Sequence, residues 1–371
     1  MINIADLKPR ILMGPGPSDV NPRVLRAMAQ PTIGHMDGQF MLVLDDIRQM
    51  LQTVFQTQNA LTLAVSGTGM AGMEASLVNL LEPGDKVLVC INGVFSARLK
   101  EVAERTGAAV TAIRVPWGQV FTPAIVHDAI SEHGPFKLVA MVHVETSTGA
   151  LQPIKAISQV VHEMGALLLV DTVASLGGVE VSVDDWQIDA CYSGSQKCLS
   201  SPPGLSMVTF SEAAVQAIET RKTPVQSWYF DMTLLRKYWG AERVYHHTPP
   251  INLYFALHEA LAMAIEEGLS ARWHRHIEAH EELKLGLGNL GLSYLTAPDC
   301  IAPTLNCVTV PTGYDEASLR KQLINDHGIE IGAGLGDFKG KAWRIGLMGE
   351  GADHYHVHSI LTALSAMLNK N

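Results

Sequence analysis

The 371-residue sequence predicts an α/β protein with a mostly parallel sheet covered by helices on both faces, followed by a smaller α+β part. Two observations support this fold class. Short apolar runs alternate with segments of helical spacing through the first half of the chain, as in βαβ proteins. After residue 250 the pattern changes to long helices and then short strands. We therefore expect an N-terminal arm over 1–20, a large domain over 21–260 and a small C-terminal domain over 261–371.

The individual elements follow from the same periodicities. Five β-branched or apolar runs predict strands, at 60–66, 86–91, 109–115, 137–144 and 166–171. Helical spacing predicts helices over 69–81 and 153–165, and long helices between 251 and 291. Short strands are expected near 293–297, 307–311 and 343–348. The first fifteen to twenty residues are expected to pack away from the large domain, for example across a subunit interface.

Composition and charge exclude several classes of partner. The chain is 47% hydrophobic and 17% charged, which is typical of an ordered, enzyme-sized protein. It has 27 basic and 37 acidic residues, a formal net charge of -10, and no dense run of Lys or Arg. This balance repels nucleic acid and anionic lipid. No uncharged apolar stretch of 18 residues occurs, so we expect no membrane partner.

Cysteine and histidine usage predicts neither disulfides nor a metal site. The five cysteines form no CxxC pair, which favours free thiols in a reducing compartment. Together with an N-terminus that lacks signal-peptide features, this predicts a cytoplasmic protein. The histidines of 354–358 begin a terminal helix, where alternate residues do not share a face. Those of 272–280 are expected to be solvated on a charged helix face.

A glycine-rich turn at 67–72, GTGMAG, follows a predicted strand and begins a predicted helix. Its spacing fits a dinucleotide site and suggests a nicotinamide oxidoreductase. That reading also requires an acidic residue about twenty positions later, and the next strand instead runs into Asn92 and Gly93. Phosphate binding by backbone N–H groups at a helix start is the interpretation that survives. The alternative is a tight turn without a ligand.

Lys197 lies in YSGSQKCLSSPPG, a run of small polar residues and glycine at 192–204. A lysine that is partly desolvated loses its proton more readily, and its neutral amine can form a Schiff base with an aldehyde. A solvated surface lysine is the alternative. Asp171 ends a buried strand and would point into the crevice where such sheets bind ligands. A phosphate site, a Schiff-base lysine and an acid for a pyridine nitrogen together predict pyridoxal 5'-phosphate.

Seven blocks of the sequence resemble the class V aminotransferases of pyridoxal-phosphate fold type I, in particular the alanine–glyoxylate and serine–pyruvate aminotransferase group. The blocks are LMGPGPSDV, SGTGMAGMEASLVNLLEPGD, ETSTGALQPI, LLLVDTVASLGG, YSGSQKCLSSPPGLS, YHHTPP and WRIGLMG. The similarity extends from about Pro15 to Met348. It implies a seven-stranded, mostly parallel sheet between helices, a smaller C-terminal domain and a homodimer.

The resemblance assigns roles around the cofactor ring. Lys197 would form the Schiff base and shuttle the proton, and Asp171 would hold the pyridinium. Thr146 matches a hydroxyl that hydrogen-bonds the ring oxygen, and Phe95 matches the aromatic residue that stacks on the ring. Relatives often have tryptophan at that position, so Phe95 keeps the π-face and lacks the indole N–H.

The same resemblance assigns the phosphate and the dimer contacts. Thr68, Gly69 and Met70 would cradle the phosphate with help from Gln196. Histidine occurs in some relatives where this chain has Met70. Tyr245 and Thr248 match residues that reach the phosphate from the neighbouring subunit.

The substrate side depends on Arg344, which matches the residue that binds the substrate carboxylate. A planar guanidinium grips a carboxylate with two parallel hydrogen bonds. The alternative is a structural arginine paired with an acid such as Glu330. Gly34 and His35 are expected to line the substrate mouth, although His35 also fits an ordinary loop histidine.

The implied reaction is a ping-pong transamination between alanine or serine and glyoxylate or pyruvate. A larger donor such as 3-hydroxykynurenine or an aminophosphonate is an alternative. A cysteine desulfurase or other pyridoxal-phosphate lyase of the same fold is a second one, with Cys198 as the candidate nucleophile. Desulfurases usually stack a histidine on the ring, whereas Phe95 occupies that position here. A non-catalytic effector-binding domain is a third, and no basic DNA-binding segment precedes the family blocks.

Overall fold

The computed structural model describes residues 1–368 and centres on a seven-stranded sheet. The strand order is β2-β10-β9-β8-β5-β3-β4, in which β10 runs antiparallel to β2 and β9 and the other pairs are parallel. The strands are β2 (Leu61–Ser66), β3 (Lys86–Ile91), β4 (Ala109–Arg114), β5 (Leu138–Val142), β8 (Leu167–Asp171), β9 (Ala190–Gly194) and β10 (Leu205–Phe210). The expected mostly parallel, seven-stranded α/β sheet is confirmed.

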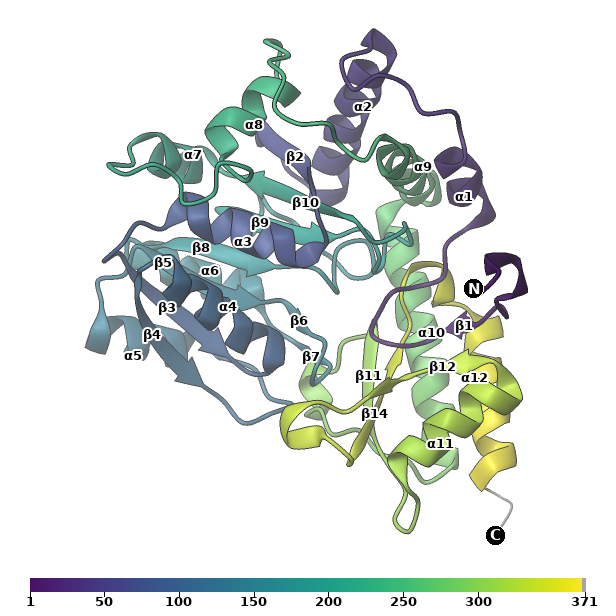
Figure 1. Ribbon diagram of the computed structural model, residues 1–371. Helices are drawn as coiled ribbons and strands as arrows, with labels where there is room; N and C mark the ends of the chain where they lie inside the picture. The colour runs from purple at the N-terminus through teal and green to yellow at the C-terminus, as the bar shows by residue number, and fades with distance from the viewer. Residues whose placement is uncertain (369–371) are drawn as a thin grey trace.

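Helices cover both faces of this sheet, because its strands are apolar on both sides. Figure 1 shows α3 and α4 in front of the sheet and α6 behind it. The helices of this part are α1 (Pro22–Met28), α2 (Gly38–Phe55), α3 (Gly69–Leu80), α4 (Val94–Arg105), α5 (Pro123–His133), α6 (Ile154–Glu163), α7 (Glu212–Glu219), α8 (Met232–Trp239) and α9 (Ile251–Glu267). The predicted helices over 69–81 and 153–165 correspond to α3 and α6.

The C-terminal part has its own three-stranded antiparallel sheet in the order β11-β14-β13. Its elements are α10 (Leu269–Asn289), β11 (Leu305–Thr309), α11 (Glu316–Gln322), β13 (Gly332–Ala333), β14 (Ala342–Gly346) and α12 (His354–Leu368). The run near 293–297 is not a strand, and its Tyr294 makes a single β-bridge to Val308. A separate apolar cluster buries Trp343 completely and packs α10 against α12.

From residue 11 onward the N-terminal segment packs on both parts of its own chain, whereas Ile2, Ile4 and Leu7 before it are exposed. The expected contact across a subunit interface stays a prediction. β1 (Ile11–Leu12) pairs in parallel with β12 (Ile329–Glu330) of the C-terminal part. Figure 1 shows the segment running from this pair past the C-terminal part to α1. We call residues 11–18 the N-terminal strap. It joins the two parts of the molecule on the side where the site described below is found.

Several groups that were predicted to be structural can also be placed. All five cysteines are free and buried. His356 bonds to Asp353 and Asp19, and it lies on a different face of α12 from His354. The prediction for 272–280 was wrong for two histidines, because His276 and His280 are buried.

No helix within residues 1–368 combines the length and the apolar character that a membrane crossing requires.

Candidate active site

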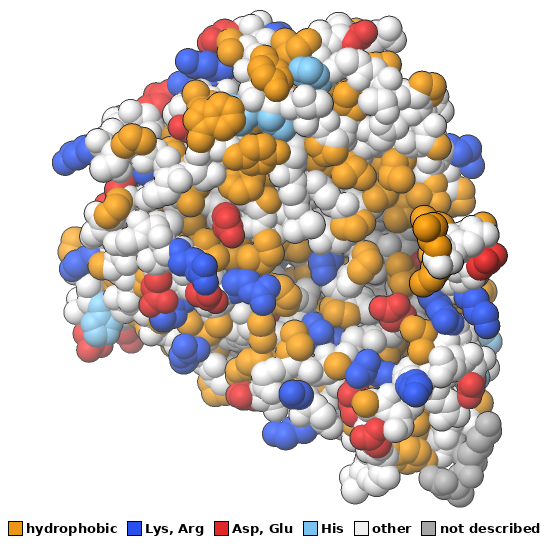
Figure 2. Space-filling model, viewed as in Figure 1, with side chains coloured by type: hydrophobic (Ala, Val, Ile, Leu, Met, Phe, Trp, Pro, Cys, Tyr) orange, Lys and Arg blue, Asp and Glu red, His pale blue; other side chains and the backbone are white. Residues whose placement is uncertain are grey.

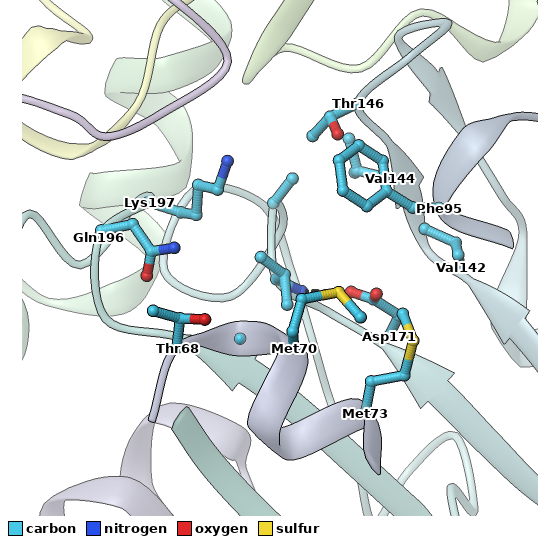
Figure 3. A pocket seen from close by; sticks show the side chains of 13 residues that line it. Thr68, Met70, Met73, Phe95, Val142, Val144, Thr146, Asp171, Gln196 and Lys197 are labelled. Atoms are coloured by element: carbon cyan, nitrogen blue, oxygen red, sulfur yellow. Dashed lines mark hydrogen bonds between the residues drawn. The ribbon is translucent and has the colours of Figure 1, made fainter. Parts of the chain in front are cut away.

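One cavity at the carboxyl ends of the strands collects the predicted cofactor residues of a single chain. Figure 3 shows Lys197 and Gln196 on one side, Phe95 and Thr146 on the other, and Asp171 at the base. The lining residues are Thr68, Gly69, Met70, Met73, Phe95, Val142, Val144, Thr146, Asp171, Val173, Ala174, Gln196 and Lys197. Five apolar residues of this set were not predicted, and they come from α3, β5, β6 (Val144–Glu145) and the turn after β8: Met73, Val142, Val144, Val173 and Ala174. Alternation along β5 and β6 places Val142 and Val144 on the same face.

Lys197 is partly buried and faces the N-terminal strap. The pKa of Lys197 is lowered to about 8, mainly by burial and less by Arg344, while Cys198 and the Asp171 carboxylate oppose the shift. Its ammonium group donates a hydrogen bond to the main-chain oxygen of Pro15. The lysine is therefore a partly buried amine with a large neutral fraction near pH 8, not a solvated surface residue.

The strap is also fixed to the main chain around the lysine. Ser18 donates its backbone N–H to the Gln196 oxygen at 3.0 Å and its hydroxyl to the Lys197 oxygen at 2.6 Å. Gly16 has a φ of +104°, and a Cβ there would lie 2.5 Å from Lys197 Nζ. Glycine is required at this position because of both its backbone conformation and the adjacent lysine.

Asp171 is held in one orientation at the end of β8. Its Oδ1 accepts from the Val173 N–H at 2.8 Å and its Oδ2 accepts from the Tyr192 hydroxyl at 2.7 Å. Burial raises the pKa of Asp171 to about 6, and these two hydrogen bonds oppose the rise. Near neutral pH the carboxyl is mostly ionised and suited to a cationic partner. Tyr192 was missed, although it begins the lysine block and pairs with Asp171 across β8 and β9.

The start of α3 offers an unused set of donors and acceptors. Thr68 is the N-cap residue, and its side chain makes no capping hydrogen bond. The first N–H groups of a helix have no acceptor within the helix and favour an anion. Gln196 Oε1 is buried and lacks a hydrogen-bond partner among residues 1–368. A Cβ at Gly69 would lie 3.0 Å from Val173, so glycine lets this turn approach the cavity floor.

Glu145 supports the wall opposite Lys197 and was also missed. Its carboxylate accepts from the Phe95 N–H at 3.3 Å, the Ser96 N–H at 2.9 Å and the Ser147 N–H at 3.1 Å. It therefore caps α4 and fixes the residue that bears the candidate stacking ring. The ETSTG block contains Glu145, but its function as a cap depends on α4, which lies about 50 residues earlier in the chain.

Arg344 lies on β14 and reaches from the C-terminal part toward the cavity. Its Nε donates to the Ala333 oxygen at 2.6 Å and its Nη1 to the Thr146 oxygen at 3.0 Å. The side chain is almost fully buried. It does not form the alternative salt bridge with Glu330. Its other N–H groups have no partner within residues 1–368. The guanidinium can therefore still receive a carboxylate.

Gly34, Tyr245 and Thr248 lie outside the cavity. Tyr245 is 58% exposed, and its ring packs 5.1 Å from the His35 ring. Gly34 and Thr248 are also exposed. Within one chain these residues therefore contact neither Lys197 nor the α3 turn.

The residues present fit pyridoxal phosphate. The unpaired N–H groups at the start of α3 suit a phosphate, Asp171 suits a ring cation, and Lys197 is a partly buried amine. Cys198 does not fit a desulfurase nucleophile. Burial raises the pKa of its thiol to about 12, and the Sγ atom points to the Ala174 oxygen.

Comparisons with known proteins agree with this chemistry. The family model described as "Aminotransferase class-V" matches residues 12–337. The alanine–glyoxylate aminotransferase of Rattus norvegicus is 43% identical over 363 residues, which cover 97% of this chain and 87% of the relative. The (S)-ureidoglycine–glyoxylate transaminase of Bacillus subtilis is 40% identical over 97% of this chain and 90% of its own.

A solved structure extends the similarity to three dimensions. The crystal structure of an alanine–glyoxylate aminotransferase from Nostoc sp. superposes with a TM-score of 0.97 at 46% identity, covering 100% of this chain and 98% of the other.

Proposed function

This chain belongs to the class-V aminotransferase family, and from this premise we propose that it transfers an amino group from alanine or serine to glyoxylate or pyruvate. It is a pyridoxal-phosphate-dependent aminotransferase, so its substrates are amino acids and 2-oxo acids. The choice of small substrates and the roles of individual residues are part of the proposal.

The observation that carries the proposal is the position of Arg344 relative to Lys197. Arg344 is anchored by two main-chain oxygens and keeps N–H groups for a ligand. One of these oxygens belongs to Thr146, which lines the same cavity as Lys197. A substrate whose carboxylate binds Arg344 would therefore have its Cα near Lys197 Nζ. Binding through a fixed guanidinium would select the Cα–H bond that is aligned for cleavage.

Bound pyridoxal phosphate supplies an electron sink that stabilises negative charge at the substrate Cα. In the proposal, Lys197 Nζ would hold the cofactor covalently between turnovers and would move the Cα proton during each half-reaction. Asp171 would keep the ring nitrogen protonated, and its carboxylate is aligned by the Tyr192 hydroxyl and the Val173 N–H. Phe95 would cover one face of the ring, and Thr68, Gly69, Met70 and Gln196 would hold the phosphate.

Covalent trapping tests the role of Lys197. Borohydride reduction of the yellow holoenzyme should fix the cofactor to one peptide, which contains Lys197 and is identified by mass spectrometry. Lys197→Ala should lose this peptide and at least about a hundredfold in activity, because no positioned base remains. A cofactor that is trapped on another lysine would contradict the assignment.

We also propose a homodimer in which Tyr245 and Thr248 serve the partner's phosphate. Large apolar side chains are exposed close to Tyr245 and Thr248, including Trp228, Tyr229 and Val244. Figure 2 shows hydrophobic side chains gathered on the upper part of the face, over α8 and its neighbours. Exposed apolar clusters of this kind mark association surfaces. Dilution to monomer should release cofactor, and a monomer with full activity and tight cofactor would refute the shared site.

A donor screen tests the substrate class. Both curated relatives have glyoxylate in their names, which favours it as acceptor. Alanine, serine and (S)-ureidoglycine should be compared with glyoxylate, and alanine with pyruvate, by single-turnover changes in the visible band of the cofactor. We expect alanine or serine to react faster than (S)-ureidoglycine. Preference for (S)-ureidoglycine, or for a donor with a large side chain, would replace the small-donor proposal.

A further inference from the structure

Helix α10 carries two arginines, Arg272 buried and Arg275 partly exposed, that bind different sides of the active site. Arg272 donates its Nε to the Gly177 oxygen at 3.0 Å and its Nη2 to the Cys198 oxygen at 2.6 Å. Arg275 donates its Nη1 to the Gly349 oxygen at 2.9 Å and the Ala352 oxygen at 2.7 Å. Cys198 directly follows Lys197, whereas residues 349–352 follow the strand that bears Arg344.

A single carboxylate joins the two guanidinium groups. Glu267, the last residue of α9, accepts from Arg272 Nη1 at 2.6 Å through Oε2 and from Arg275 Nε at 2.7 Å through Oε1. Burial opposes ionisation of Glu267, but the two arginines hold its pKa below the usual range. Because Arg272 is only 2% exposed, its charge depends on this partner and on the carbonyl groups. The three side chains therefore form one connected unit.

His276 completes the contact between α10 and the turn at 349–352. Its Nδ1 hydrogen-bonds the Arg272 oxygen at 2.7 Å, and its Nε2 accepts from the Gly349 N–H at 3.0 Å. Burial lowers the pKa of His276 to about 3, so the ring is neutral and Nε2 is free to accept. We call residues 197–201 the lysine loop. The turn contacts this loop directly, because Ser200 Oγ accepts from the Glu350 N–H at 2.9 Å.

These contacts connect the two groups that the proposed function places around the substrate. We propose that Arg272 and Arg275, joined by Glu267, are positioning residues that fix the separation between Lys197 and Arg344. Arg272 fixes the main chain at the lysine, and Arg275 fixes the turn after β14. The inference rests on the proposed roles of Lys197 and Arg344. Neither arginine touches the substrate, so each acts through the backbone that it holds.

The two arginines should have separable effects. Arg272→Gln should lower kcat roughly ten- to hundredfold with a smaller change in KM, because a displaced lysine is misaligned for proton transfer. It should also shift the pH at which the visible band of the bound cofactor changes. Arg275→Gln should instead raise KM for both substrates by about tenfold. It should weaken by a similar factor the binding of propionate, an unreactive carboxylate, followed by its perturbation of the same band.

Arg48 provides a matched control. It shares the carboxylate of Asp45 with a second arginine, Arg243, and donates to the Trp239 oxygen at 3.0 Å. Its side chain is 29% exposed, as is that of Arg275. Arg48→Gln removes a similar cluster far from the lysine loop and the 349–352 turn. This variant should lower the thermal stability but should show neither the selective fall in kcat nor the selective rise in KM.

The conservative variants keep the test independent of folding losses. Arg272→Lys and Arg275→Lys retain the positive charge beside Glu267, but an ammonium group cannot reproduce all the hydrogen bonds of the guanidinium. The lysine variants should therefore show the same separation of effects, on kcat for Arg272 and on KM for Arg275, at a smaller size. Unfolding midpoints by circular dichroism identify the variants that are folded. Folded Arg272 and Arg275 variants that behave like Arg48→Gln would overturn the inference. Equal effects of both arginines on kcat and KM would do the same.

The proposed function fails in a different way. Propionate binding that is unchanged in Arg344→Lys would show that the carboxylate site lies elsewhere. If Arg344→Lys weakens propionate binding as expected, but the Arg272 and Arg275 variants show no separate effects on kcat and KM, only the positioning role of the two arginines is rejected.

Discussion

The two walls of the active site are built in different ways. The cofactor wall consists of the cavity residues proposed to bind the cofactor. They lie at the ends of strands of the central sheet and at the starts of the helices that follow, and Asp171, Lys197 and the α3 turn each lie within a short, recognisable sequence block. The carboxylate wall joins segments that are distant in sequence. Arg344 contacts Thr146, which is 198 residues away in the sequence. A wall made from local motifs is visible in a sequence, whereas a wall made from distant backbone contacts is not.

This difference predicts distinct signatures for variants of the two walls. Changes in the cofactor wall should alter the visible spectrum and the cofactor affinity. Changes in the carboxylate wall should leave the spectrum of the resting enzyme almost unchanged and affect substrate steps.

Asp171→Asn should have the largest effect. The neutral amide cannot hold the ring nitrogen protonated, and the loss of one partner from a buried charged pair costs about 3–5 kcal/mol. We expect activity to fall by about 10²- to 10³-fold while circular dichroism shows the native fold, with a changed cofactor absorption band. Near-native turnover in the folded variant would remove Asp171 from the cofactor site.

Arg344→Lys should be the next in size. One ammonium group cannot reproduce two parallel hydrogen bonds to a carboxylate, so transition-state binding should weaken by roughly 2–4 kcal/mol. The loss should appear as lower kcat/KM in both half-reactions, with the resting spectrum unchanged. Amines without a carboxylate are the control and should react equally slowly with both forms. If cofactor binding is abolished instead, Arg344 belongs to the cofactor wall and the comparison breaks down.

Gly16→Ala tests the border between the walls. The added methyl group conflicts with the Lys197 amine, and the φ of +104° disfavours alanine. We expect the rate of covalent cofactor attachment to fall about tenfold, for a penalty of about 1–2 kcal/mol. Gly38→Ala is the matched control, because a Cβ there meets nothing within 4 Å. Equal rates in the two variants would show that the strap does not restrict the lysine.

The pH dependence of cofactor attachment should be the smallest effect. Burial lowers the pKa of Lys197 from its ordinary value to about 8, and the neutral amine is the nucleophile. The attachment rate of the cofactor-free protein should therefore rise as the pH increases and level off above about pH 8. Stopped-flow absorbance measures this rate. A rate that still rises above pH 10 would indicate a solvated lysine.

The sequence predicted more of the cofactor wall than of its surroundings. The strands near 60–66, 86–91, 109–115, 137–144 and 166–171 were found because each is a compact run of apolar or β-branched residues. β9 and β10 were not predicted. β9 has the mixed composition ACYSG. Its buried polar side chains Tyr192 and Ser193 find hydrogen-bond partners in Asp171 and Thr172, at the end of the neighbouring strand.

Two histidines of α10 were predicted to be exposed but are buried. His276 and His280 lie in a segment rich in charge, and the charge pattern predicted a solvated face. The helix in fact packs against the lysine loop, the 349–352 turn and β11, where His280 bonds to Asn306 at 2.7 Å. Buried polar groups need partners, and here those partners come from other parts of the chain.

The sequence by itself determined the fold class, the family and the chemical groups that face the cofactor. These depend on local patterns: apolar runs, a glycine turn at a helix start, and a lysine and an aspartate beside strands. The tertiary structure alone decided the orientation of Asp171 by Tyr192, the contact of Lys197 with Pro15 and the link between the two arginines of α10. Each of these contacts ends on a backbone oxygen or a side chain that sequence spacing does not identify, because only the packed chain brings the two atoms together.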